Sequence, residues 1–496
     1  MSSSSTSKAM EGCCPRPPGF SRRMSGVHCL CLSALVAIAV SFCHQRGFRS
    51  PTAVSRLDLL HALVSQRTLK IDAYHKNTPD KSCIDGHFYS DKAPGTVVLA
   101  LPSFFTAAML LRLTGESPES EVGWLVTSWV ASAASNGLFA ACGAAAAFAW
   151  LCRWVSPRTA LLSTLSIFLG AAPLPYATMM FSHALVVGLI AIALGGVAPG
   201  TEREVWNVQC GVRSWLKTNR WDLLAGHACG WVLASEYTAG LVVLGIFVFL
   251  LLTGWRRAIP FSLAAVLPLL LIPAYSLACF GNPLILSYSL SESFPPMKEG
   301  LYAIKWPNPE NAANLLFSPT RGFFFWSPFL LMAVFGFREL AQRSTPAFWL
   351  AYAVPALQII VISGRIWDWP AGPTLGPRYL APILPLLALP CALGVQRFPQ
   401  IGITLAAYSI LITTLATLTD ACPPASIYNP LLELHIPLFL KGEFSPNLGM
   451  VLGLPPYASV ALYYAILIGG IAWLWYKLPR QEGVDSPERV AHNGAK

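Results

Sequence analysis

The run of residues 85–95 gathers the side chains of this chain that are best suited to chemistry. It places Asp85, His87, Asp91 and Lys92 beside a Pro94-Gly95 turn, in a chain that is otherwise mostly apolar. Ionisable groups close to a bilayer are costly unless they are paired or serve a site. An acid and a base held by a rigid turn at a membrane surface therefore suggest a reaction on a charged, lipid-attached substrate.

The same polar segment, residues 44–93, supplies the candidate proton acceptors. Asp72 and Asp80 lie among lysines, and a carboxylate that faces a hydroxyl can act as a general base. Lys92 is the candidate for holding a phosphate, because an ammonium group binds phosphate as a point charge. Tyr89 and Asp91 are expected to contact the substrate. Each single acid is also compatible with a solvated loop of mixed charge.

Two further cations stand at the ends of apolar segments that should share a face with Lys92. Arg378 follows a segment that contains Trp369, and Arg321 follows Ser318-Pro319-Thr320. The alternative for each is an arginine that extends to the interface beside an aromatic belt. Three cations at the outer ends of separate apolar segments predict a shared anionic ligand, and Trp369 is a candidate contact for it.

His183 and Glu236 complete the set of candidates, as substrate-binding residues at two turns on that face. Each can equally be a local structural residue. The sequence has no Walker loop, no GxGxxG and no HExxH, so nothing supports a nucleotide-driven enzyme or a zinc protease. We expect no cofactor, and a need for a divalent cation stays open.

Composition identifies the class of protein that must position these residues. The chain has 496 residues, of which 54% are hydrophobic and 12% charged, whereas soluble domains carry about a quarter charged residues. The net charge of +10 is dispersed in short loops, which argues against a nucleic-acid partner. The sequence predicts an all-α, multi-pass membrane protein in contact with lipid.

Windows of roughly 20 apolar residues predict about twelve transmembrane helices. They lie near 27–43, 124–152, 159–177, 183–199, 222–235, 237–254, 259–280, 323–337, 347–363, 379–395, 401–418 and 458–476. The segment 95–112 decides the topology. If it lies along the surface as a juxtamembrane helix, the short basic turns all fall inside, as the positive-inside rule requires. Long polar segments then share the outer face, at 44–93, 281–321, 364–378 and 419–457.

This topology divides the chain into four parts. Residues 1–25 are expected to be a disordered cytoplasmic tail, and 26–400 a transmembrane catalytic core that includes the outer loop 44–93 and the helix 95–112. Residues 401–476 form a C-terminal transmembrane region with an outer loop at 419–457. Residues 477–496 are a cytoplasmic tail.

Three features of residues 27–400 together resemble the GT-C superfamily of integral membrane glycosyltransferases. They are the acidic first outer loop closed by residues 89–95, the segment Gly376-Pro377-Arg378-Tyr379-Leu380, and the outer turn that ends at His183. The similar groups are the protein O-mannosyltransferases, the lipid A aminoarabinose transferases and the Rgt-type bacterial enzymes. The chain lacks the paired acids that such relatives carry near the start of the loop, since Asp58 stands alone in Ser55-Arg56-Leu57-Asp58.

The resemblance implies a mannosyltransferase-like reaction on the extracytoplasmic face of a bacterial plasma membrane. The donor would be a polyprenyl-phosphate-linked sugar, and the acceptor hydroxyl would belong to a glycan, a lipid or a protein. An outer-loop aspartate, Asp72 or Asp80, would deprotonate the acceptor, and C1 would be displaced with inversion. Lys92, with Arg378 and Arg321, would hold the departing phosphate.

Two other classes of protein remain as alternatives. A transporter or flippase of a lipid-linked or anionic solute would place paired charges near the middle of its spans, whereas the acids and bases here gather in loops. A non-catalytic assembly subunit would tolerate the loss of Asp72, Asp80 and Lys92 together.

Overall fold

A computed structural model describes residues 22–45, 50–197, 212–293, 304–365 and 372–479. Within these residues, seven segments are long and apolar enough to cross a membrane, by length and composition: Gly95–Leu113, Glu121–Leu151, Tyr237–Phe280, Thr345–Ser363, Arg378–Arg397, Pro399–Thr419 and Pro456–Lys477. Two shorter apolar helices are Gly26–Ser41 and Ser182–Val197. The prediction of an all-α polytopic membrane protein is confirmed. The expected tails at 1–25 and 477–496 lie almost entirely outside the described residues.

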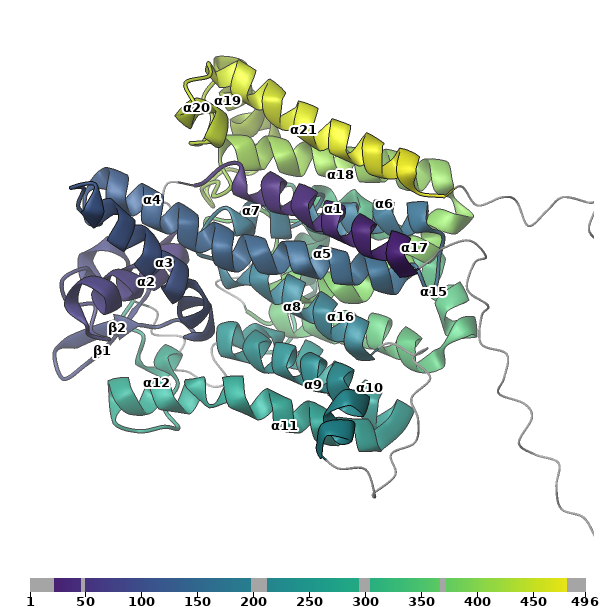
Figure 1. Ribbon diagram of the computed structural model, residues 1–496, viewed down its shortest axis with the longest axis horizontal. Helices are drawn as coiled ribbons and strands as arrows, with labels where there is room; N and C mark the ends of the chain where they lie inside the picture. The colour runs from purple at the N-terminus through teal and green to yellow at the C-terminus, as the bar shows by residue number, and fades with distance from the viewer. Residues whose placement is uncertain (1–21, 46–49, 198–211, 294–303, 366–371, 480–496) are drawn as a thin grey trace, which may run out of the picture.

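The long helices run roughly side by side and form the body of the molecule (Figure 1). They are α1 (Arg22–Ser41), α4 (Glu121–Ser132), α5 (Leu138–Leu151), α6 (Pro157–Phe168), α8 (Ser182–Val197), α9 (Val212–Ser235), α10 (Gly240–Gly254), α11 (Ala258–Leu269), α15 (Met332–Arg343), α16 (Thr345–Ser363), α17 (Leu384–Arg397), α18 (Pro399–Thr419) and α21 (Pro456–Lys477). The segment Tyr237–Phe280 has 44 residues, which is about 66 Å of helix. It is long enough for the two expected spans near 237–254 and 259–280.

Several expected spans are shorter or more polar helices than the sequence windows suggest. The window 159–177 contains α6, which ends at Phe168, and the short helix α7 (Pro173–Ala177). Gly170 and Pro173 separate the two, because neither residue type favours a helix interior. Where helices do pass closely, they do so at small residues. A Cβ atom on Gly143 of α5 would collide with the backbone of Gly188 in α8, a contact typical of membrane helices.

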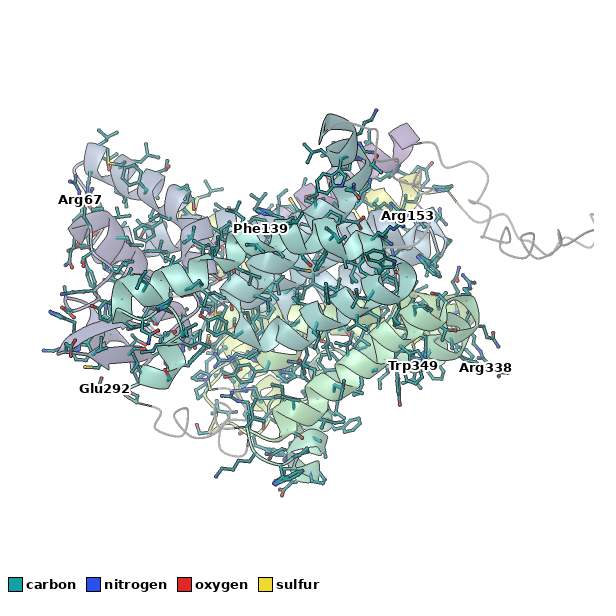
Figure 2. All side chains as sticks on the ribbon, turned by 90° about the horizontal axis from the view of Figure 1, so that it is seen from below. Arg67, Phe139, Arg153, Glu292, Arg338 and Trp349 are labelled. Carbon is teal, nitrogen blue, oxygen red and sulfur yellow. The ribbon has the colours of Figure 1, made fainter. Side chains whose placement is uncertain are left out.

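One end of the body carries a group of shorter elements, here called the loop end (Figure 1). It contains α2 (Pro51–His61), the strands β1 (Lys81–Ile84) and β2 (His87–Ser90), α3 (Gly95–Leu113) and α12 (Leu271–Phe280). Figure 2 places Arg67 and Glu292 at this end and the turn residues Arg153 and Arg338 at the opposite end. The labelled residues of the first two long polar segments, 44–93 and 281–321, thus lie at the end opposite these short basic turns, in agreement with the predicted topology.

The first polar segment is more ordered than a loop. α2 buries ten of its side chains, Thr52 to His61. The strands pair antiparallel across a turn at Asp85 and Gly86, whose φ angles are 50° and 77°. Asp-Gly is the sequence signal for this kind of two-residue hairpin turn, so the hairpin was recognisable from the residues. Other short elements of the chain are α13 (Pro309–Phe317), α14 (Phe323–Trp326), α19 (Ile436–Lys441) and α20 (Leu448–Val451).

α3 is the element on which the predicted topology depends. It lies at the loop end beside α2 and α4 (Figure 1). Its 19 residues are also long and apolar enough to cross a membrane, so its juxtamembrane position stays a prediction. Its first residue, Gly95, touches the end of α9, where a Cβ atom would come within 2.6 Å of Ser235 Oγ. The Pro94-Gly95 turn therefore fixes Lys92 next to the C-terminal end of α9.

Candidate active site

The hairpin register brings together two acids that are far apart in the sequence. Lys81 pairs with Ser90, so Asp80, just before β1, lies opposite Asp91, just after β2. Lys92 sits between them. Its Nζ lies 2.8 Å from Asp80 Oδ2 and 3.0 Å from Asp91 Oδ1. The side chains are 7%, 6% and 1% exposed for Lys92, Asp80 and Asp91, and pairing is what permits such burial of charge.

The two carboxylates respond differently to this shared cation. Burial raises the pKa of Asp91, Lys92 lowers it and the negative charge of Asp80 raises it, and together these effects bring it to about 6. Burial also acts on Asp80, but Lys92 and the hydroxyl of Thr52 outweigh it and hold the pKa of Asp80 below its usual value. Asp80 is therefore the ionised partner, and Asp91 can exchange a proton near neutral pH.

A hydroxyl on α2 connects this acid pair to a predicted arginine. Thr52 Oγ1 donates to Asp80 Oδ2 over 2.8 Å, and Arg378 Nη1 donates to Thr52 Oγ1 over 3.0 Å. Arg378 also donates to the hydroxyl of Tyr379 and faces the ring of Phe181. The first turn of α2 thus bridges Asp80 in the first polar segment and Arg378, which lie far apart in the sequence.

One helical turn further along α2, Arg56 reaches the second pair of predicted residues. Arg56 Nη2 donates to Ser182 Oγ over 3.1 Å, and Ser182 donates to Glu236 Oε2 over 2.6 Å. His183 Nε2 lies 3.8 Å from the same carboxylate oxygen. Thr238 donates to the other oxygen of Glu236 over 2.9 Å. Glu236 and His183 are therefore brought together, next to the N-terminal half of α2.

We call this assembly the Lys92 centre. It combines three basic and three acidic side chains with two bridging hydroxyls: Lys92, Arg56, Arg378, Asp80, Asp91, Glu236, Thr52 and Ser182. Because formal charges of both signs are equal in number, protonation of one acid would favour the presence of a further anion. An arrangement of this kind can hold a charged leaving group and receive a proton in the same place.

A second segment at the loop end holds the Lys92 centre from the other side. Ser287 Oγ donates to Asp91 O over 2.8 Å, and Tyr275 OH donates to Ser90 O over 2.9 Å. The ring of Tyr288 lies 5.2 Å from Lys92 Nζ, in reach of a cation–π contact. The backbone that carries Lys92 is thereby tied to α12 and to the segment that follows it.

Asp72 lies outside this centre. Its side chain is 41% exposed, and its two oxygens accept hydrogen bonds from His87 Nδ1 over 2.8 Å and from Phe88 N over 2.7 Å. Burial raises the pKa of Asp72, but the hydrogen bonds from Phe88 N and His87 together outweigh burial and hold this pKa below its usual value. Asp72 therefore braces the hairpin, and of the two candidate bases the structure brings only Asp80 into contact with Lys92.

The remaining predicted residues occupy separate places. Tyr89 is buried against Phe280 at a ring distance of 5.6 Å, where it packs the hairpin onto α12. Arg321 is buried and binds backbone carbonyls, away from the hydrogen bonds of the Lys92 centre. Trp369 lies in 366–371, outside the described residues. Among the residues that the structure does describe, no three His, Cys, Asp or Glu side chains cluster to hold a metal ion.

Sequence reasoning missed the contribution of α2. Thr52, Ser55 and Arg56 form a polar stripe at i, i+3 and i+4, which a helix places on one face. In a segment of otherwise buried residues, this stripe is a signal of contact with other polar groups. It was not recognised because the segment 44–93 was treated as a loop, and without a helix the three residues have no common face.

The chain is similar to solved structures. No protein-family model matches the chain, and no curated protein sequence matches it. The crystal structure of ArnT from Cupriavidus metallidurans in the apo state is similar, with a TM-score of 0.47 and 16% sequence identity. The likeness covers 91% of this chain and 75% of that one.

Proposed function

We propose that this protein is a membrane glycosyltransferase that moves a sugar from a polyprenyl-phosphate donor to an acceptor hydroxyl. The observation that supports this most strongly is Lys92 held between Asp80 and Asp91, with Arg378 one hydroxyl away. The resemblance of residues 89–95 and 376–380 to GT-C glycosyltransferases points in the same direction. The reaction would take place at the loop end, on the extracytoplasmic face.

The charge balance of the Lys92 centre fits this reaction. The donor is a phosphodiester with one negative charge, and its departure as a phosphate monoester leaves a second charge on the phosphate. The acceptor hydroxyl loses one proton in the same step. Uptake of that proton by the acid pair of Asp80 and Asp91 keeps the total charge of the buried centre constant, which avoids the large free energy of isolated buried charge.

The roles of the residues follow from this balance. Lys92 and Arg378 stabilise the negative charge that develops on the leaving oxygen, which is the largest effect in most reactions of this kind. The acid pair accepts the proton from the acceptor oxygen while that oxygen attacks C1. The bond from C1 to the phosphate oxygen breaks, and inversion at C1 results. Asp72 has no part in these steps.

The test is transfer of label from a panel of radiolabelled polyprenyl-phosphate sugars into lipid, glycan and protein fractions of membranes. Membranes would contain the wild type or Asp80→Asn at matched expression. We expect transfer by the wild type, with inverted configuration at C1 of the product, and loss of transfer in Asp80→Asn. Undiminished transfer in Asp80→Asn would overturn the assignment. Movement of labelled donor across the bilayer without transfer would support a flippase instead.

A further inference from the structure

An apolar groove lies between helices at the end of the molecule opposite the loop end. Its walls are aromatic and aliphatic side chains from α5, α8, α10, α16 and α17, together with Leu340 of α15 and Trp154 just after α5. Trp154, Ala347 and Leu350 are half-buried, whereas the other wall residues are buried, so the groove opens on the side of these three. We call it the Arg343 groove, after the arginine described below.

The opening stands at the level where lipid headgroups are expected. Trp154 follows the predicted span 124–152, and Ala347 begins the predicted span 347–363. Exposed aromatic rings mark the same level, since Trp349 is 54% exposed and lies at this end (Figure 2), and Trp is enriched where a membrane meets water. A ligand in the groove would therefore have lipid on one side and water on the other.

The space inside the groove is small. Its free volume of about 30 Å³ holds roughly two groups of the size of a water molecule. A short stretch of one alkyl chain fits, and a whole lipid or a soluble cofactor does not. A ligand must therefore enter in part and leave the rest of its chain in the bilayer.

Arg343 is the cation at the opening. Its Nη1 donates to Trp154 O over 3.0 Å, and its Nη2 pairs with the carboxylate of Glu339, one turn back on α15. The two side chains are 32% and 35% exposed. An ion pair this exposed to solvent contributes little free energy, so an anion that arrives at the opening can compete with Glu339 for the guanidinium.

The chain around the opening carries a net positive charge. Residues 150–158 and 336–347 contain four cations and a single acid: Arg153, Arg158, Arg338, Arg343 and Glu339. Figure 2 shows Arg153 and Arg338 at this end of the molecule, which the predicted topology places at the cytoplasmic leaflet. Anionic lipids of that leaflet attract basic residues close to the surface, each by about 1 kcal/mol. The charge around the opening is thus complementary to an anionic headgroup.

Trp150 lines the groove and brings a buried donor to it. Its side chain is 8% exposed, and its Nε1–H has no acceptor among the described residues. Native proteins leave few buried polar groups without partners, and each such group calls for an explanation. A ligand with a carbonyl oxygen next to its alkyl chain would supply the missing acceptor.

We propose that the Arg343 groove binds one anionic phospholipid of the membrane leaflet at this end. The phosphate contacts Arg343, an ester carbonyl accepts from Trp150 Nε1–H, and the adjoining methylene groups pack beside Leu350. A glycerophospholipid carries an anionic phosphate, an ester carbonyl and an alkyl chain in this order. The binding does not depend on the proposed glycosyltransferase activity, because the groove and the Lys92 centre lie toward opposite ends of the molecule.

The test is native mass spectrometry of the full chain, released from detergent micelles after titration with phosphatidylglycerol or phosphatidylcholine. We expect saturable binding of one phosphatidylglycerol, with phosphatidylcholine at least about fivefold weaker because it has no net charge. Glycerol phosphate, which has the headgroup chemistry but no chain, should not displace the bound lipid. Displacement by glycerol phosphate at an equal concentration would contradict a site that includes the groove.

Three variants separate the contacts. Arg343→Gln should weaken phosphatidylglycerol binding about fivefold or more, and Trp150→Phe, which keeps a ring and removes the N–H donor, about threefold. Glu339→Gln removes the acid that competes for Arg343 and should tighten binding about twofold. A purely structural role of Arg343 would not produce this gain.

Arg67→Gln is the matched control, because Arg67 is an exposed arginine at the loop end (Figure 2). It should bind phosphatidylglycerol as the wild type does. Absence of saturable binding, equal binding of the two lipids, or full binding in Arg343→Gln would each overturn the proposal. If Arg343→Gln does not fold, Trp150→Phe and Glu339→Gln decide, and wild-type binding in both would overturn it. The transfer assay is independent of these results.

Discussion

The Lys92 centre and the surroundings of Arg321 differ in how their buried cations are compensated. Lys92 lies within 3.0 Å of two carboxylates, whereas Arg321 binds three backbone carbonyls. A cation that shares two acids can exchange charge and protons with a reacting group without leaving any group unpaired. A cation held by carbonyl dipoles has no such acid to exchange a proton with. We infer that the first region is the one built for a reaction.

The local structure explains this difference. The hairpin register sets Asp80 opposite Asp91, so the carboxylates of both residues face Lys92, which follows shortly after β2. Arg321 is held by chain segments that approach one another as loops, and loop backbone offers carbonyls. Pro423 and Gly372, which accept from Arg321, come from two such segments.

The largest expected effect concerns the acid pair. Asp80→Asn leaves Asp91 alone with Lys92, which lowers the basicity of Asp91, so transfer should fall by about 100-fold or more. Asp72→Asn should keep activity within about twofold, because Asp72 braces the hairpin from its outer side. Initial rates in membranes with matched expression measure both. Equal losses in the two variants would place Asp72 in the reacting centre after all.

The next effect distinguishes the two arginines. Arg378→Gln removes a charge-assisted hydrogen bond to Thr52 and should lower the transfer rate at saturating substrate by about 100-fold. Arg321→Gln should lower that rate by less than about tenfold. The measurement is steady-state kinetics with both substrates varied. The comparison between the two regions breaks down if Arg321→Gln has the larger effect on the maximal rate.

The pH dependence of transfer tests whether the acid pair accepts the proton. Burial raises the pKa of Asp91 to about 6, and a base must be ionised, so the rate should fall as the pH drops below about 6. Asp80 contributes to the raised pKa, so the residual activity of Asp80→Asn should persist to lower pH. Transfer rates of the wild type and of Asp80→Asn, measured between pH 4.5 and 8.5, give the acidic limb of each pH profile. An identical acidic limb in the two proteins would exclude Asp91 as the titrating group.

The smallest effect is one of stability and concerns a buried acid with no cation within salt-bridge distance among the described residues. Asp58 accepts from Asn77 over 3.0 Å, and burial raises its pKa from 3.8 to about 7. The folded state then keeps a proton that the unfolded chain releases, so stability falls as the pH rises from about 4 to 7, by at most about 4 kcal/mol. Asp58→Asn has no carboxyl group at this position, so its stability should not fall in this way over the same pH range.

Thermal unfolding of the purified protein in detergent checks this expectation at pH 5 and pH 8. Relative to the wild type, Asp58→Asn should gain stability on going to pH 8. The same difference between variant and wild type at both pH values would show that Asp58 is not a buried acid of raised pKa.

The sequence predicted the membrane class and part of the candidate site. Lys92, Asp80 and Arg378 were identified by residue type, and the structure brings them together through Thr52. Asp72 could not be separated from Asp80, because only the hairpin register shows which acid faces Lys92. The separate position of Arg321 depends on contacts with residues 372 and 423, and one sequence does not reveal contacts over such distances.

The most direct test of the account compares two lysines of the same loop. Lys92→Ala removes the cation between Asp80 and Asp91, whereas Lys81→Ala removes one that is 14% exposed and lies 3.7 Å from the exposed carboxylate of Glu292. Purified protein in lipid vesicles, checked for folding by its unfolding transition, would be assayed for transfer from a polyprenyl-phosphate sugar. We predict a loss of about 1,000-fold in Lys92→Ala and a change within about twofold in Lys81→Ala. Transfer by a folded Lys92→Ala protein at the rate of Lys81→Ala would contradict the central role of the Lys92 centre.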